Sequence, residues 1–267
     1  MGSTRAKRQI RSMLAVDFRR IFRTPFFYLV IGICFVMPIL ILVMTTMMDG
    51  TVSVNPQTGA ETVIEGFDNV WQIIGSVSTA QADAAAGMDM SITAMCNVNM
   101  LYFLIAVPVC VFVAGDFRSG YAKNLFTVRA GRTDYVVSKT IVCTVAAMLM
   151  LLVFFIGAVV GGKMVGLPFE MNGFNGANLV FCLLCKLVLA AVFVPIYLIM
   201  SVCAKQRLWL SILLSMMTGM FLFMMIPMLS PLNATVAQLG LCLAGGVLFP
   251  IGLGLVGRAI LRKRSIL

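Results

Sequence analysis

Six long apolar runs constrain the fold of this chain more than any other feature of its sequence. Each run has about 20 residues, the length that an α-helix needs to cross a hydrocarbon layer of ~30 Å. Apolar residues make up 61% of the 267-residue chain and charged residues only 11%, against about 45–50% and about 25% in soluble domains. We therefore expect an all-α membrane protein that forms one transmembrane domain over residues 1–267. The predicted spans are 26–48, 92–114, 136–160, 179–203, 208–229 and 237–256.

The segments between these runs alternate in charge. All but two of the 20 basic residues lie in segments 1–25, 115–135, 204–207 and 257–267, or at the adjoining helix end. The alternate segments 49–91, 161–178 and 230–236 hold seven of the ten acidic residues. Basic loops stay on the cytoplasmic side, so both termini are expected to be cytoplasmic. The extracellular loop 49–91 is then either an ordered connector on the membrane surface or a lid over an outward exit.

Missing residue types exclude several kinds of chemistry. The chain has no histidine, which excludes Ser-His-Asp triads and HExxH zinc sites. No acid lies inside a predicted span, where a carrier of protons or Na⁺ would normally keep one. Residues 157–163 fit G-x-x-x-x-G-K, but Met164 stands where a phosphate loop needs Ser or Thr. We therefore expect no catalytic residue, no metal and no bound cofactor in this chain, and hence no ATP hydrolysis by it.

An amphipathic arm, residues 5–24, precedes the first span. Its apolar residues recur at the three- and four-residue spacing of a helix, and basic residues surround them. Such a helix lies flat in the inner-leaflet interface, unless its charge only sets the topology. Thr24 and Pro25 then cap and open the first span. The arm residues expected at the membrane surface are Arg11, Phe18, Arg19, Arg20, Phe22 and Arg23.

The loop 115–135, between the second and third spans, contains the pattern of a short helix. Tyr121, Leu125, Phe126 and Val128 give this helix an apolar side, and Gly131 suits its end. A short amphipathic helix exposed between membrane helices is typical of a docking element for a cytoplasmic partner.

Few polar side chains fall within the predicted spans. Lys186 is the single charge well inside one; its ammonium either snorkels or finds a structural partner, or it lines a polar cavity or a subunit seam. Asn97, Asn99, Ser211 and Ser215 can hydrogen-bond between helices. These five residues are candidates for a substrate path or seam.

The combination of these features resembles a known family. A basic arm that ends in F-R-T-P, six spans and the loop D-F-R-S-G-Y-x-K-N-L…R-x-G-R-x-D-Y-x-x-S-K are similar to the permease subunits of bacterial type-2 ABC exporters. The matching positions are Asp116, Gly120, Arg132 and Lys139, and Asp116 stands where Glu is more usual.

The resemblance implies a permease in the bacterial inner membrane, a second permease chain and a separate cytoplasmic ATPase subunit that binds ATP and Mg²⁺. It makes 119–130 the coupling helix. Contacts to the ATPase are expected at Asp116, Gly120, Leu125, Phe126, Arg129 and Arg132. The expected cargo is an amphiphilic or hydrophobic drug or a membrane-active peptide, exported from the cytoplasm or inner leaflet; nucleic acid is not an expected partner. The alternative is an integral membrane sensor or accessory protein that recruits a cytoplasmic partner but transports nothing.

Overall fold

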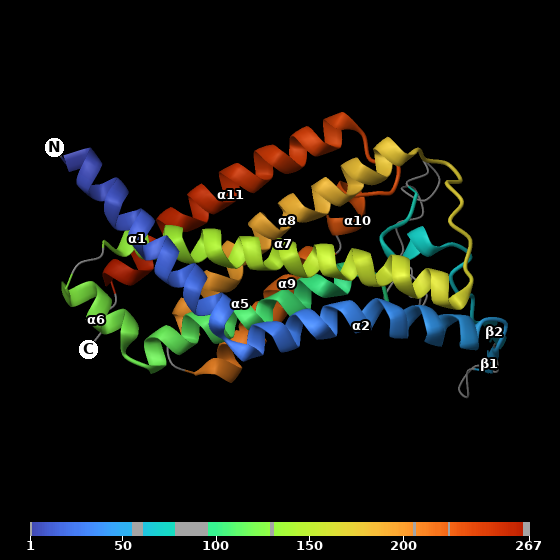
Figure 1. The fold of residues 1–267 in the computed structure, drawn as a ribbon, viewed down its shortest axis with the longest axis horizontal. Helices are drawn as coiled ribbons and strands as arrows, with labels where there is room; N and C mark the ends of the chain where they lie inside the picture. The colour runs from blue at the N-terminus through green and yellow to red at the C-terminus, as the bar shows by residue number, and fades with distance from the viewer. Residues whose placement is uncertain are drawn as a thin grey trace.

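The computed structural model describes residues 2–54, 61–77, 96–128, 131–204, 207–223 and 225–263. Over these ranges the chain forms an elongated helical bundle with a small hairpin at one end (Figure 1). The helices are α1 (Gly2–Arg23), α2 (Pro25–Met48), α5 (Leu101–Arg118), α6 (Tyr121–Val128), α7 (Arg132–Val165), α8 (Gly176–Ala204), α9 (Leu208–Phe223), α10 (Met225–Leu229) and α11 (Val236–Lys263). The hairpin pairs β1 (Val52–Val54) with β2 (Glu61–Val63), and two 3₁₀ turns are η1 (Val70–Ile73) and η2 (Val98–Met100).

Five helices in the described chain are long and apolar enough to cross a membrane. They are Pro25–Met48, Val98–Arg118, Arg132–Val165, Gly176–Ala204 and Val236–Leu261. These five confirm a multi-pass membrane protein and correspond to five of the six predicted spans.

The remaining predicted span, 208–229, contains α9 and α10, and residue 224 between them lies outside the described chain. The 16 described residues of α9 are fewer than the ~20 that cross a hydrocarbon layer, so this sixth span stays a prediction. Prolines inside α2, α5, α8 and α11 do not end those helices, as is tolerated in membrane helices, and Pro227 lies within α10.

The second predicted span begins later than expected. The Asn97 side chain accepts a hydrogen bond from the Asn99 backbone N–H at 2.9 Å and caps η2, and α5 follows at Leu101. Residues 92–95 lie outside the described chain. By contrast, α7 extends beyond 136–160 at both ends and stops at Gly166, whose φ of 80° is accessible to glycine without strain.

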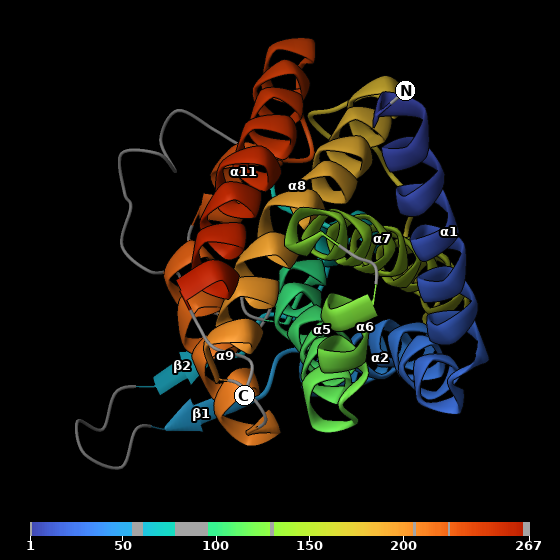
Figure 2. The same cartoon turned by 90° about the vertical axis from the view of Figure 1, so that its left-hand side faces the viewer.

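In the bundle, α7 is the central helix. It packs against α1, α2, α8 and α11, while α5 lies against α8 and α9. Figure 2 looks nearly along α7 and shows α1, α2, α5 and α8 around it. The start of α1, all of α6 and the end of α11 lie at one end of the bundle, and the hairpin lies at the other (Figure 1).

Two glycines explain the close packing of α7 on α2. A Cβ at Gly157 would collide with the Phe35 carbonyl oxygen, and one at Gly161 would lie 3.0 Å from the Ile39 Cα. The G-x-x-x-G spacing therefore allows direct contact between backbones, as in other membrane helices.

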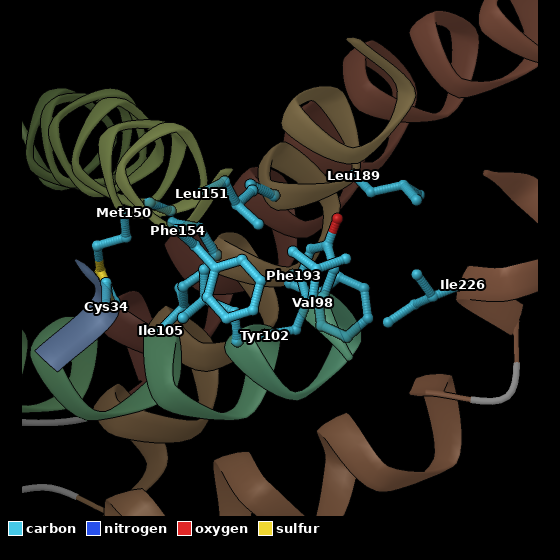
Figure 3. Packing of buried hydrophobic residues seen from close by; sticks show 14 of the residues in the cluster. Cys34, Val98, Tyr102, Ile105, Met150, Leu151, Phe154, Leu189, Phe193 and Ile226 are labelled. Atoms are coloured by element: carbon cyan, nitrogen blue, oxygen red, sulfur yellow. The ribbon is translucent and has the colours of Figure 1, made fainter. Parts of the chain in front are cut away.

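The apolar core joins helices that are distant in the sequence. Figure 3 shows Cys34 of α2 beside Met150 of α7, and Phe154 of α7 facing the Ile105 side of α5. The outer loop contributes as well, because the Trp71 ring stacks on Phe155 of α7 with centroids 6.4 Å apart. The part of this loop from Phe67 to Ile74 is thus packed against the bundle. The rest of loop 49–91, at 55–60 and 78–91, lies outside the described residues.

Candidate functional site

Four charged side chains from three helices meet at the end of the bundle that carries α6. They are Asp17 and Arg20 of α1, Asp116 of α5 and Lys139 of α7. The Asp17, Asp116 and Lys139 side chains are 0% exposed, and that of Arg20 is 35% exposed. Two acids and two bases leave this charge cluster neutral as a whole.

Each carboxylate oxygen of the charge cluster has a donor. The Lys139 Nζ lies 2.8 Å from Asp17 Oδ1 and 2.7 Å from Asp116 Oδ2. The Arg20 Nη2 donates to Asp116 Oδ1 at 2.7 Å, and the Ser138 hydroxyl donates to Asp17 Oδ2 at 2.7 Å. This pairing of both carboxylates offsets the cost of removing their charges from water.

Aromatic rings enclose the two cations. The Lys139 Nζ lies 3.8 Å from the centre of the Phe112 ring, and the Arg20 Cζ lies 4.1 Å from that of Tyr121. Both distances are within the range of cation–π attraction. Burial alone lowers the pKa of Arg20, but the carboxylate of Asp116 outweighs it and the pKa is raised. Arg20 is therefore charged at any physiological pH.

The short helix α6 is attached to the charge cluster by its apolar side. The Tyr121 ring lies under Arg20, Ala122 is buried, and Phe126 packs edge-on against Tyr135 of α7 with centroids 5.3 Å apart. The Tyr135 hydroxyl donates to an oxygen of Asp116 at 3.2 Å. Contacts from α6 therefore lead directly to the buried charges.

The predicted docking residues lie on different faces of α6 and its flanks. Leu125 and Phe126 are half-buried and pack toward the core of the bundle. Among residues 121–127 of α6, Lys123, Asn124 and Thr127 are exposed.

The flanks of α6 hold the other predicted residues. Gly120 joins α5 to α6 with a φ of 73°, a conformation that favours glycine. Arg132 is half-buried in the first turn of α7, and Arg129 lies outside the described residues.

The arm forms helix α1 and packs on α7. Phe18 and Phe22 stack with centroids 6.0 Å apart. Arg11, Arg19 and Arg23 are exposed. Their contact with a lipid surface stays a prediction.

Sequence reasoning missed Asp17 as a site residue, although a signal was present. Met13, Asp17 and Ile21 are spaced by four residues and share one face of α1; all three are buried. An acid in the middle of the arm's apolar stripe predicts a buried basic partner. Lys139 entered only through the family resemblance, and Ser138 was not singled out at all.

A second polar group lies deeper in the bundle, near the hairpin end. The buried Lys186 Nζ of α8 donates to Asn99 Oδ1 at 3.1 Å and to Ser230 Oγ at 3.0 Å. The structure therefore brings together two of the five candidate path residues. Ser211 and Ser215 are buried on α9, at its contact with α5.

Comparison with known proteins supplies the family. No curated protein and no solved structure gives a significant match to this chain. The sequence does match the family described as "ABC-2 family transporter protein" over residues 13–224. This match covers well over half of the chain and contains the charge cluster and α6. The chain therefore belongs to the ABC-2 transporter family and is a membrane-spanning permease subunit.

Proposed function

We propose that this permease is part of an ATP-driven exporter and that a separate cytoplasmic ATPase subunit moves it through α6. The observation that supports this most strongly is the attachment of α6 to buried charges shared by α1, α5 and α7. An element that only recruited a partner would not need such an attachment.

In this mechanism the exposed residues of α6 contact the ATPase. Lys123, Asn124 and Thr127 form the contact surface, while Phe126 holds the opposite side of α6 on Tyr135. When ATP binding closes the ATPase subunits, α6 is displaced. The ion pairs of Lys139 with Asp17 and Asp116 then make α1, α5 and α7 move together.

The ATPase binds ATP and Mg²⁺, and this chain supplies the path. Two permease chains pair, and the six-span topology requires α9 and α10 to cross the membrane together. The exposed apolar face of α9 supports such a pairing seam, beside α2 and α5. Its exposed large residues include Trp209, Leu213, Met217, Met220 and Phe221. A mainly apolar seam favours an amphiphilic or hydrophobic cargo.

The orientation of the bundle in the membrane follows from the distribution of its basic residues. The end of the bundle with α6 carries the basic arm, so we assign it to the cytoplasm of a bacterial cell. Both termini are cytoplasmic in this assignment, and the β1–β2 hairpin is extracellular.

Affinity purification tests the proposal. The tagged chain is extracted from its native membrane in mild detergent, its partners are identified, and ATP hydrolysis is assayed. Lys123→Glu is compared with Lys163→Glu, because both lysines are exposed and lie on opposite ends of the bundle. An ATP-binding subunit should accompany the wild type and Lys163→Glu, and Lys123→Glu should lose both the subunit and the hydrolysis.

Two results would contradict the proposal. Equal recovery of the ATPase with both variants would show that α6 is not the docking element. Recovery of other cytoplasmic proteins without any ATPase would favour the sensor or accessory role.

A further inference from the structure

A surface groove between α7 and α11 has no role in the mechanism above. Its volume is about 330 Å³, within the range of roughly 300–1,000 Å³ that small-ligand pockets occupy. The groove is apolar apart from two threonine hydroxyls. Its lining residues are Thr133, Val136, Val137, Thr140 and Ile141 of α7 and Pro250, Ile251, Gly254 and Leu255 of α11.

Two arginines stand at one end of this groove. Arg258 follows Gly254 by four residues and Ile251 by seven, so helical periodicity places it on the stripe of α11 that faces the groove. Arg132 immediately precedes Thr133. Within the described chain neither guanidinium forms an ion pair. Both belong to the end of the bundle that carries α6.

The two helices α7 and α11 are in contact at this end, so the groove is closed there. A Cβ at Gly257 of α11 would lie 3.7 Å from the Cγ1 methyl of Val136 and 3.7 Å from the Cγ1 methylene of Ile199. Above this contact a Cβ at Gly254 meets nothing within 4 Å. The open space is therefore bounded by Gly257 and the two arginines on the cytoplasmic side.

We propose that this groove binds one anionic phospholipid of the cytoplasmic leaflet. An acyl chain of this lipid lies along Val137, Ile141 and Ile251 and covers their apolar side chains. The phosphate is held by Arg132 and Arg258, whose planar guanidinium groups suit phosphate oxygens. Basic pockets between membrane helices on the cytoplasmic side recognise anionic headgroups in this way.

The charge distribution separates this groove from the rest of the lipid-facing surface of α11. Leu248, Phe249 and Val256 are exposed large residues that any apolar chain can cover. The groove adds concavity and two cations that form no ion pair with a carboxylate in the described part of the chain. Charge complementarity therefore selects an anionic lipid over a zwitterionic one.

Native mass spectrometry of the purified chain in mild detergent tests the proposal. Phosphatidylglycerol and phosphatidylcholine with identical acyl chains are titrated separately, and the fraction of protein that retains one lipid is measured. Gly254→Leu fills the groove with a side chain for which there is space. Gly252→Leu is the matched control, because a Cβ there also meets nothing within 4 Å and Gly252 does not line the groove.

The wild type and Gly252→Leu should retain one phosphatidylglycerol with roughly tenfold preference over phosphatidylcholine, and Gly254→Leu should lose this bound lipid. Arg258→Gln should bring the two lipids close to equal retention. Equal retention of both lipids by the wild type would overturn the proposal. So would equal phosphatidylglycerol binding by Gly254→Leu and Gly252→Leu. Neither readout depends on an ATPase partner, so the result is independent of the proposed export function.

Discussion

Two buried lysines of this protein are stabilised in different ways. Lys139, at the end that carries α6, contacts two buried carboxylates at 2.7 and 2.8 Å. Lys186, deeper in the bundle, donates hydrogen bonds within the described chain only to the neutral oxygens of Asn99 and Ser230. The first lysine is part of a neutral cluster, whereas the second is a cation among dipoles.

The difference concerns how firmly each site holds its helices. Opposite charges in a low-dielectric region attract strongly, and removing one of them leaves the others unpaired. Neutral oxygens bind an ammonium more weakly than carboxylates do, so removing the ammonium costs less stability. The Lys139 site is thus suited to move α1, α5 and α7 as a unit, and the Lys186 site is suited to local rearrangement between α8, η2 and the end of α10.

The largest expected effect comes from Lys139→Met. This change leaves Asp17 and Asp116 buried without their shared cation, and it should lower the free energy of unfolding by about 3–5 kcal/mol. The midpoint of unfolding in a denaturing-detergent titration measures it. Lys163→Met, at an exposed position, is the control and should change stability by less than about 0.5 kcal/mol. Similar midpoints for the two variants would show that Lys139 stabilises the fold no more than an exposed lysine does.

A smaller effect is expected from Ser138→Ala. The change removes one donor from Asp17 Oδ2 but leaves the Lys139 contact to Oδ1 in place. The loss should be about 1–3 kcal/mol, the cost of an unsatisfied buried acceptor. The same unfolding titration checks it, and Ser138→Thr, which keeps the hydroxyl, should recover part of the loss.

A weaker response is expected from Lys186→Met. Removing the ammonium deprives Asn99 and Ser230 of a donor, but it also relieves the desolvation of a buried cation. The Ser230 hydroxyl keeps its own bond to the Ile226 carbonyl at 2.8 Å. The two effects oppose each other, so unfolding stability should change by about 1 kcal/mol or less. A loss as large as that of Lys139→Met would show that the two sites are equivalent.

The smallest effect is expected at the exposed edge of the charge cluster. Arg20→Lys keeps the charge near Asp116 but loses the planar stacking on Tyr121. Because the Arg20 side chain is 35% exposed, water screens the change, and the expected loss is about 0.5 kcal/mol. Thermal unfolding in detergent compares it with the wild type; a loss above that of Lys139→Met would show that Arg20, not Lys139, dominates the charge cluster.

The sequence predicted the spans well because a membrane requires long apolar runs, and such runs are directly visible. The start of α5 was predicted less well, because the Asn97 side chain caps η2 and α5 follows only at Leu101. Whether an asparagine within an apolar run caps a helix or lies inside it depends on its local backbone hydrogen bonds, which hydropathy does not show.

The charge cluster was only partly predictable. Asp116 and Lys139 belong to a recognisable loop pattern, but their partner Asp17 lies 99 residues away from Asp116 in the sequence. The spacing of Met13, Asp17 and Ile21 indicates that Asp17 is buried, not which helix receives it. The partner of Lys186 was similarly undefined, since Asn99 and Ser230 approach it only after α5, α8 and α10 have packed.

Chemical cross-linking of the purified permease with its ATPase tests whether α6 is the docking element for that subunit. A lysine-reactive cross-linker is added to the complex, and the linked peptides are identified by mass spectrometry. Lys123 on α6 and Lys163 at the far end of α7 are both exposed, so they report on opposite ends of the bundle. We expect links from Lys123 to the ATPase and none from Lys163. Links from Lys163 to the ATPase, with none from Lys123, would contradict both the orientation and the role of α6.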